Sequence, residues 1–479
     1  MQKKHGSFTE EREGEGPVTK VNLGRLTNCI FAFSLLFLFK NIQIPSILEV
    51  DSPDYLPKYL EMITPEAFNF VNAFLVIAII WILTFHILHR IRRLNHGFLF
   101  LHFGMLMTLV FIPVSSLLAD DFPKEPIFSL ILHLNILLIS SFLLMEWKSV
   151  CYHETLLHHY IGEIEIRKTY IRLFFLIGAS LIGVILTLYD WEQTRFIYIL
   201  VLLILFFESV LSDRERWRRK HELREIGTLE KEGLPEDRPV IPAGHLLPDD
   251  HTTGTNDYQG PVGMDMLEIL MNGVFAFTMT LIVKNITLPR VSDGQNIDLI
   301  VDFFFKIFFD TIEFVLVFII LAFFWVLTFQ LLRWMRAVDL TFVYLELFLL
   351  LHIVFIPVTS SLFTFFGDET HISILYSLNI LFCGLILIIQ WYYVSRRTDL
   401  LNEEAAFRIK CAPIHLFLRG YIQIRTNEGR DQSILRIRNH LFILPIVSII
   451  WLVFSLIDMG YLLVPVLIGV CYLVFKLWD

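Results

Sequence analysis

The stretch Asn-Cys-Ile-Phe-Ala-Phe at residues 28–33 returns as Asn-Gly-Val-Phe-Ala-Phe at residues 272–277. Each copy runs on through Lys-Asn-Ile, at residues 40–42 and 284–286, to a proline. Each is an apolar segment with a polar head, and its length is close to the roughly 20 residues that cross a bilayer as a helix. The chain is therefore predicted to be a duplication, whose function depends on this helix and its copy.

The two copies keep one register over four apolar segments. Asn28 and Asn272 are 244 residues apart, and the same offset relates several other motifs. These are the Trp-containing segments 81–85 and 325–329, the Phe-Ile-Pro-Val segments 111–114 and 355–358, the Leu-Asn-Ile-Leu segments 134–137 and 378–381, and the pair Trp147 and Trp391. Because the loop lengths are preserved as well, chance similarity between apolar helices does not explain the repeat.

Composition places the chain in a membrane. Of its 479 residues, 55% are hydrophobic and 18% are charged, whereas soluble domains have about 45–50% apolar and roughly 25% charged residues. We predict an all-α polytopic membrane protein with twelve transmembrane helices in two parallel six-helix repeats. The expected spans are 26–45, 69–89, 97–118, 127–147, 170–189, 195–211, 267–289, 312–333, 340–363, 372–392, 437–457 and 459–477.

The predicted domains follow from this count. A polar tail (1–25) precedes the first repeat (26–211), and a charged linker rich in Pro and Gly (212–262) precedes the second repeat (263–479). Lysine and arginine concentrate in the loops after the second and fourth spans of each repeat, and such loops stay on the cytoplasmic side. Both termini and the linker are therefore expected to be cytoplasmic.

These motifs, in their order and spacing, resemble the transmembrane protein 175 family. The resemblance covers nearly all of both halves and is sharpest in Gly-Val-Phe-Ala at residues 273–276. The family comprises endolysosomal potassium channels with two six-helix repeats and bacterial relatives with one. The resemblance implies a pseudo-tetrameric pore made by a homodimer, in which the first helix of every repeat lines the ion path.

The first-helix motif departs from the family pattern of Arg, three residues, then Phe-Ser-Asp. The last three positions are Leu-Thr-Asn at residues 26–28 and Leu-Met-Asn at residues 270–272, and Asn22 and Met266 replace the arginine. The resemblance places the pore constriction five residues after the motif, at Phe33 and Phe277. It also implies that the motif ties the first helix to its neighbours, a structural role carried here by Asn28, Asn272, Trp81, Trp325 and His86.

Helical spacing defines a candidate pore face. Positions three, four and seven residues apart share one side of a helix, which groups Cys29, Phe33, Leu36, Phe37 and Lys40 in the first repeat and Gly273, Phe277, Thr280, Leu281 and Lys284 in the second. A ring of large apolar side chains closes a pore by dewetting, whereas a ring of lysines favours anions. Two alternatives stay open: lysines that reach the interface from lipid, and phenylalanines that only pack.

Ionisable side chains in apolar segments are costly and mark functional sites. His102 and Glu346 are related by the 244-residue offset, so they could pair across the pseudo-symmetry axis or respond to pH. A haem or metal site is a competing hypothesis, with His86, His102 and His133 as candidate ligands. The repeat weighs against it, because no histidine set is shared by both halves.

The expected function is an ion channel, a potassium leak channel in the first place, with proton permeation as a further option. The alternatives are an anion-permeable or non-conducting homologue, because of Lys40 and Lys284, and a transporter or a haem- or metal-binding membrane protein. No enzymatic motif is present. The expected partners are small ions, the lipid bilayer and a second copy of the chain, with no cofactor, no metal and no nucleic acid. Endolysosomal, plasma and bacterial inner membranes stay open.

Overall fold

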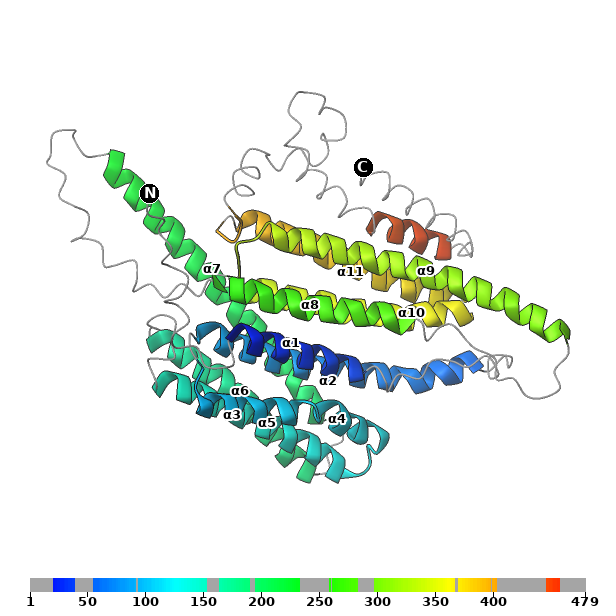
Figure 1. Cartoon of the computed structure of the whole chain (residues 1–479), viewed down its shortest axis with the longest axis horizontal. Helices are drawn as coiled ribbons and strands as arrows, with labels where there is room; N and C mark the ends of the chain where they lie inside the picture. The colour runs from blue at the N-terminus through cyan, green and yellow to red at the C-terminus, as the bar shows by residue number, and fades with distance from the viewer. Residues whose placement is uncertain are drawn as a thin grey trace, which may run out of the picture. The chain divides into compact units, whose positions relative to one another are not determined.

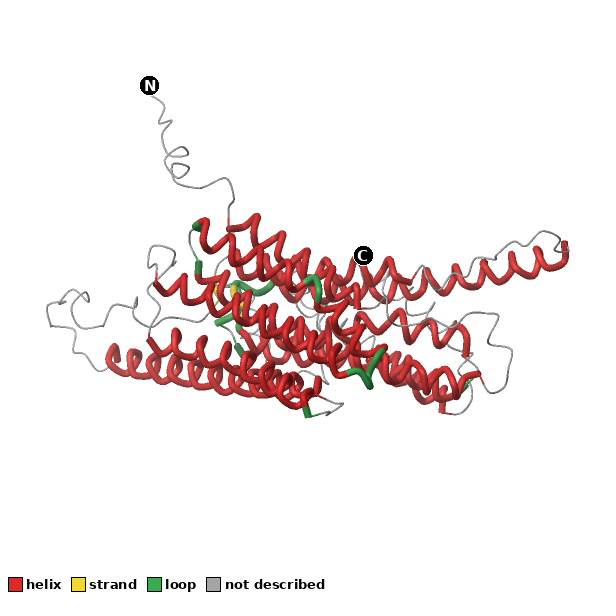
Figure 2. The backbone as a smooth tube through the Cα atoms, turned by 90° about the horizontal axis from the view of Figure 1, so that it is seen from below, coloured by secondary structure: helices red, strands yellow, loops and turns green. Residues whose placement is uncertain are grey.

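The computed structural model describes residues 20–38, 55–91, 94–152, 163–189, 194–232, 258–259, 261–282, 297–366, 369–397, 399–402 and 445–456. Figure 2 shows that this part of the chain is almost entirely helical. It divides into two compact units, residues 1–34 with 72–258 and residues 35–71 with 259–479. Each unit is described by itself below.

The first half of the chain contains one helix after another (Figure 1). In chain order these are α1 (Lys20–Phe37), α2 (Tyr55–Arg90), α3 (His96–Leu109), α4 (Ile112–Asp121), α5 (Pro126–Tyr152), α6 (Glu163–Leu188), the 3-10 turn η3 (Thr194–Phe196) and α7 (Ile197–Glu232). Within the first unit, α5 packs against α3, α4 and α6, so it is the helix around which this unit is built.

The second half repeats the pattern. Its helices are α8 (Pro261–Leu281), α9 (Ile297–Arg333), α10 (Leu340–Phe366) and α11 (Thr370–Arg396), followed by the shorter helix Pro445–Leu456. Two short strands, β1 (Tyr258–Gln259) and β2 (Ala337–Val338), form a two-stranded sheet. Within the second unit, α10 packs against α8, α9 and α11.

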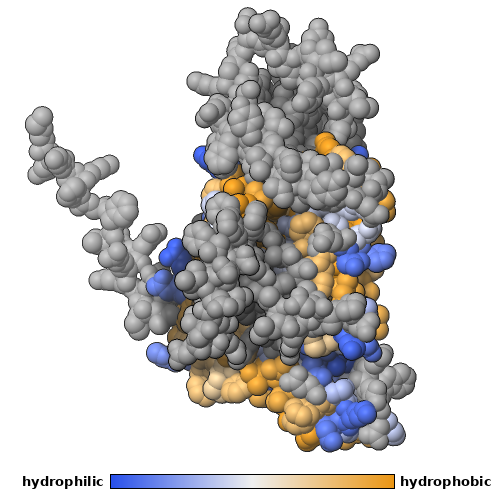
Figure 3. Space-filling view, turned by 90° about the vertical axis from the view of Figure 1, so that its right-hand side faces the viewer, coloured by the Kyte–Doolittle hydropathy of each residue, from blue (hydrophilic) through white to orange (hydrophobic). Residues whose placement is uncertain are grey.

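Nine helices among the described residues are long and apolar enough to cross a membrane. Their outer surfaces carry exposed apolar side chains, such as Phe100 at 78% and Met107 at 65% exposure on α3. Figure 3 shows such hydrophobic side chains on one face of the molecule, beside hydrophilic ones. The expected membrane class is therefore confirmed. The count of twelve spans stays a prediction: α1 is not among the nine, and the span expected at 459–477 lies outside the described residues.

The linker differs from the prediction at its start. The sequence predicted a span ending at residue 211, but α7 continues as a helix to Glu232, although its apolar part ends at Glu215. Residues 212–226 contain no Pro or Gly and are rich in Arg, Glu and Lys, which have high helix propensity. The helix therefore extends into the charged segment.

The two repeats differ at the Phe-Ile-Pro motif. In the first repeat the helix is interrupted there, because α3 ends at Leu109 and α4 begins at Ile112 with Pro113 in its first turn. In the second repeat α10 is continuous through Pro357. A proline removes one backbone hydrogen bond and crowds the preceding turn, so the same residue breaks one copy and is accommodated in the other.

Candidate functional site

Helix α1 has a buried face and an exposed face. Thr27, Asn28 and Phe31 are fully buried. Cys29, Phe33 and Phe37 follow one another at intervals of four residues and are exposed, Phe33 to 68% and Phe37 to 46%. Three residues of the predicted pore stripe, Cys29, Phe33 and Phe37, are therefore exposed in the described part of the chain; their place at a pore stays a prediction.

The buried face of α1 is held by a tryptophan. Trp81 Nε1 on α2 donates a hydrogen bond of 2.8 Å to Asn28 Oδ1. The second repeat has the same bond, because Trp325 Nε1 on α9 donates to Asn272 Oδ1 at 2.7 Å. In both repeats the first and second helices are therefore joined at one equivalent position.

His86, which the resemblance grouped with these residues, has a different partner. Its Nε2 lies 2.9 Å from Thr169 Oγ1 on α6. The ring also lies near Trp147 on α5, with centroids 6.1 Å apart. His86 therefore contacts α5 and α6 in the first unit.

The corresponding face of α8 is less open than that of α1. Gly273 and Phe277 are half-buried, and Thr280 is exposed with its hydroxyl donated to the Phe277 carbonyl at 2.7 Å. Leu281 is buried at 7% exposure, unlike Phe37 at the equivalent position of α1. The Leu36 side chain and the whole of Lys40 and Lys284 lie outside the described residues.

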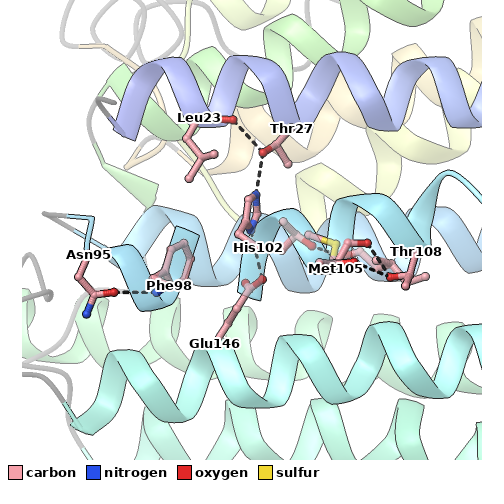
Figure 4. Close-up of polar contacts among 11 residues, drawn as sticks. Leu23, Thr27, Asn95, Phe98, His102, Met105, Thr108 and Glu146 are labelled. Carbon is pink, nitrogen blue, oxygen red and sulfur yellow. Dashed lines mark hydrogen bonds and ion pairs between the residues drawn. The ribbon is translucent and has the colours of Figure 1, made fainter. Parts of the chain in front are cut away.

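A histidine of α3 also contacts the buried face of α1. In Figure 4, His102 of α3 lies between Thr27 of α1 and Glu146 of α5. His102 Nε2 is 2.8 Å from Thr27 Oγ1, and His102 Nδ1 is 3.2 Å from Glu146 Oε1. All three side chains are fully buried, so three helices of the first unit meet at one histidine.

Glu346, the counterpart of His102, has its own partner. Gln390 Nε2 on α11 donates to Glu346 Oε2 at 2.9 Å, and both residues are fully buried. Each residue thus has a hydrogen-bond partner within its own repeat, and the suggested pairing of His102 with Glu346 stays a prediction. Glu146 and Gln390 were missed as partners. They occupy equivalent positions at the 244-residue offset, each one residue before a tryptophan, and that equivalence could have identified them.

Two further pairs obey the same offset. Asn135 Nδ2 donates to Ser115 Oγ at 3.4 Å, and Asn379 Nδ2 donates to Thr359 Oγ1 at 3.3 Å. The starts of α3 and α10 are capped alike, by Asn95 on the Phe98 amide at 2.7 Å and by Asp339 on the Phe342 amide at 2.9 Å. Such caps satisfy amides that a helix start leaves unpaired. The duplication is thus preserved in individual contacts as well as in sequence.

The candidate metal ligands do not come together. His133 Nδ1 and Nε2 lie 2.8 Å from Tyr198 Oη and from Thr194 Oγ1, so both ring nitrogens have hydroxyl partners. His86 and His102 have the separate partners given above. Over the part of the chain that the structure describes, no group of three His, Cys, Asp or Glu side chains could hold a metal ion.

Membrane-length helices, a register shared by both halves and equivalent interhelical contacts define a polytopic α-helical membrane protein with an internal repeat. Residues 22–113 and 266–357 each match the family described as endosomal/lysosomal potassium channel TMEM175. The two matched segments begin and end 244 residues apart, which is the offset of the repeat. The first part of each repeat therefore matches this family of potassium channels. No curated protein matches the chain.

Proposed function

We propose that the chain forms a potassium-permeable leak channel in which α1 and α8 line the ion path. The observation that carries the proposal is the division of α1 into two faces. Asn28 and Thr27 are tied to α2 and α3, while Cys29 and Phe33 are exposed. A pore-lining helix needs both faces, because one must pack against other helices of the protein and the opposite one must border the ion path.

Phe33 and Phe277 form the constriction in this proposal. They are equivalent in the repeat, and each lies one and a half turns beyond the asparagine that receives the tryptophan bond. Rings of this size make a narrow apolar passage, which excludes water and ions until it widens. The hydrogen bond behind each helix would fix the depth and rotation of its phenylalanine.

A homodimer completes the arrangement, since two chains with two repeats supply four lining helices. Cyclic two-fold dimers are the commonest soluble oligomers, and the internal repeat extends that symmetry to a pseudo-fourfold axis. Twelve spans with both termini and the linker in the cytoplasm belong to the same proposal.

Reversal potentials of the purified protein in planar bilayers, under gradients of potassium, sodium and chloride, test it. We expect cation current that is larger and less selective when Phe33→Ala and Phe277→Ala are combined. Phe100→Ala is the matched control, because Phe100 is 78% exposed on α3 and has no place in the proposed path; it should leave the current unchanged.

Lack of cation current in both the wild type and the double variant would overturn the proposal. Chloride current that disappears with Lys40→Gln and Lys284→Gln would assign the lysines to an anion path. The increase in current in the double Phe→Ala variant must also exceed any increase in the Phe100→Ala control, because a general loosening of the helix bundle would affect both variants.

A further inference from the structure

The exposed face of α7 changes from apolar to basic near residue 212. Phe207 and Leu211 are each 59% exposed, and Arg214 and Arg218, which follow at intervals of three and four residues, are exposed as well. Residues at this spacing share one side of a helix. Within one turn, the surface of α7 thus passes from side chains that suit lipid tails to side chains that suit anions.

Helix α6 has the same change. Arg167 is exposed, and Ile171 and Phe174, which follow at intervals of four and three residues, are 44% and 56% exposed. The membrane-length segment begins at Ile166 on α6 and ends at Glu215 on α7. On both helices the exposed arginine therefore lies where the membrane-length segment ends.

Two polar contacts fix how α6 and α7 lie against each other. Lys168 Nζ donates to Ser212 Oγ at 3.0 Å, and one turn further into the apolar segments Arg172 Nη2 lies 2.7 Å from the carboxylate of Glu208. Four residues forward on α6 thus correspond to four residues backward on α7. The two helices are therefore antiparallel neighbours at this end.

The same contacts place the two exposed arginines at one level. Arg167 is one residue outward from Lys168, and Arg214 is two residues outward from Ser212. Since a helix rises about 1.5 Å per residue, the two arginines begin at nearly the same depth. Among the side chains that the structure describes, neither guanidinium has a hydrogen bond or an ion pair.

Positive charge is concentrated in the turns of α7 next to its apolar segment. The helix continues to Glu232 (Figure 1). Residues 214–220 contain five Arg or Lys residues and one Glu, whereas residues 221–232 contain four Glu residues against one Arg and one Lys. A charged membrane surface acts over about a Debye length, on the order of 10 Å, and residue 221 is about 10 Å beyond Arg214 along the helix. The basic excess is thus confined to the zone in which lipid headgroups act.

The apolar part of the surface is long enough for lipid tails. Exposed apolar side chains extend from Leu211 back to Leu200 on α7 and from Ile171 to Ile182 on α6. Each stretch is about 16 Å long at about 1.5 Å per residue, and half of a hydrocarbon core is about 15 Å thick. Free phosphate or an acidic peptide would match the arginines only, whereas a phospholipid matches both parts of the surface.

We propose that Arg167 and Arg214 bind the phosphate groups of anionic phospholipids, in the leaflet where α6 begins and α7 leaves the membrane. The lipid tails lie on the exposed apolar side chains of the same helices. Arginine suits this role, because its planar guanidinium forms two parallel hydrogen bonds with a phosphate. The inference rests on the membrane setting of the chain and not on conduction along α1 and α8.

Native mass spectrometry of the purified full-length protein tests the proposal, because it counts the lipids bound to each chain. The probes are phosphatidylserine and phosphatidylcholine with identical tails, of which only the first has a net negative charge. We expect the wild type to prefer phosphatidylserine. Arg167→Gln combined with Arg214→Gln should lower the apparent affinity for phosphatidylserine by about fivefold for each arginine removed and should change that for phosphatidylcholine much less.

The matched control removes the same charge from the same helix. Arg224→Gln combined with Lys231→Gln changes only the outer part of α7, beyond the reach of the headgroups, and should leave the preference unchanged. If the control variant loses the preference as strongly, total charge and not position is the cause, and the assignment is wrong. Size-exclusion chromatography checks that both variants are folded, as expected for substitutions of exposed arginines.

The apolar part of the surface has its own test. Phe207→Ala combined with Leu211→Ala removes contacts with lipid tails but no charge. This variant should weaken the binding of both lipids and keep the preference between them. If it changes the binding of neither lipid, the bound lipid does not lie on this face of α7.

Two results with the wild type alone would overturn the proposal. The first is equal binding of the two lipids. The second is displacement of bound phosphatidylserine by an excess of inorganic phosphate, because the arginines would then form a phosphate site without lipid tails. Raising the ionic strength should reduce the preference for phosphatidylserine, since salt screens exposed charges, and a preference independent of salt contradicts recognition by these arginines.

Discussion

In each repeat, an asparagine side chain joins the first helix to the second. Replacing Asn28 by alanine leaves the indole N–H of Trp81 buried without an acceptor. Buried unsatisfied donors cost about 1–3 kcal/mol, whereas interhelical bonds in membranes average roughly 0.6 kcal/mol. We therefore expect Asn28→Ala to lower the free energy of unfolding by about 1 kcal/mol, measured from thermal unfolding in detergent.

Trp81→Phe is the matched control, since it removes the indole donor and so leaves no buried N–H without an acceptor when Asn28 is replaced. Asn272→Ala should cost a similar amount at Trp325, and the two effects should add because the sites lie in different repeats. If Asn28→Ala is as destabilising in a Trp81→Phe background as in the wild type, the hydrogen bond is not the cause.

Lys20 gives a pH dependence at the start of α1. Burial lowers its pKa from the ordinary 10.5 to about 8, while its ammonium donates to the His89 carbonyl at 3.0 Å. Between pH 8 and pH 10.5 the unfolded chain binds a proton that the folded chain does not. The free energy of unfolding therefore rises with pH over that window, and this gain is lost as the pH falls through 8.

The measurable quantity is the difference between wild type and Lys20→Gln, which keeps a donor but does not titrate. Unfolding midpoints are measured from pH 7 to pH 10. Above pH 8, the midpoint of the wild type should rise relative to that of the variant. A constant difference over this range would contradict the lowered pKa.

At the scale of elements, α6 contains two glycines in different surroundings. A Cβ on Gly183 would lie 2.5 Å from His133 Nδ1 and 2.6 Å from His133 Cε1, and the imidazole cannot move easily because both nitrogens are bonded. A Cβ on Gly178 would meet nothing within 4 Å. Gly183 therefore allows α5 and α6 to pack closely, whereas Gly178 lies at no such contact.

Gly183→Ala should therefore destabilise the protein by about 1–3 kcal/mol through overpacking. Gly178→Ala should stabilise it by up to about 1 kcal/mol, because alanine is the better helix former. Thermal unfolding of the two variants gives opposite signs if α6 packs on α5 as observed, and equal signs if it does not.

The sequence predicted which segments are helices, but it predicted less well where each helix begins and ends and which side chains are in contact. Hydropathy identifies the apolar core of a helix only, so α2 begins at Tyr55 and not near residue 69, and α7 continues to Glu232. The Asn28–Trp81 contact could be expected from the motif. The partners of His86 and His102 could not, because they depend on how neighbouring helices are rotated, which a sequence of uniformly apolar positions does not determine.

For the whole molecule, the duplication was predictable because it preserves spacing, and its asymmetry was not. The shared offset reproduces tryptophan, asparagine and capping contacts in both halves. The interruption between α3 and α4 and the burial of Leu281 have no counterpart in the other repeat. A pseudo-fourfold pore would thus combine two kinds of lining helix, with α1 the more open.

That difference makes Cys29 a reporter of assembly. It is an exposed free cysteine on the α1 stripe, and glycine takes its place on α8. In a two-fold dimer with α1 at the pore, the two copies of Cys29 face each other across the axis. A short bifunctional maleimide added to native membranes should therefore produce a covalent dimer.

Cys29→Ser should abolish that product, and Cys151→Ser, at a half-buried position near the end of α5, should retain it. A monofunctional maleimide must first label Cys29, which establishes that the thiol is accessible. With labelling established, a chain that stays monomeric after the bifunctional reagent, or a dimer that persists in Cys29→Ser, contradicts the placement of α1 at a two-fold pore. The four-helix path requires that placement, because one chain supplies only two lining helices.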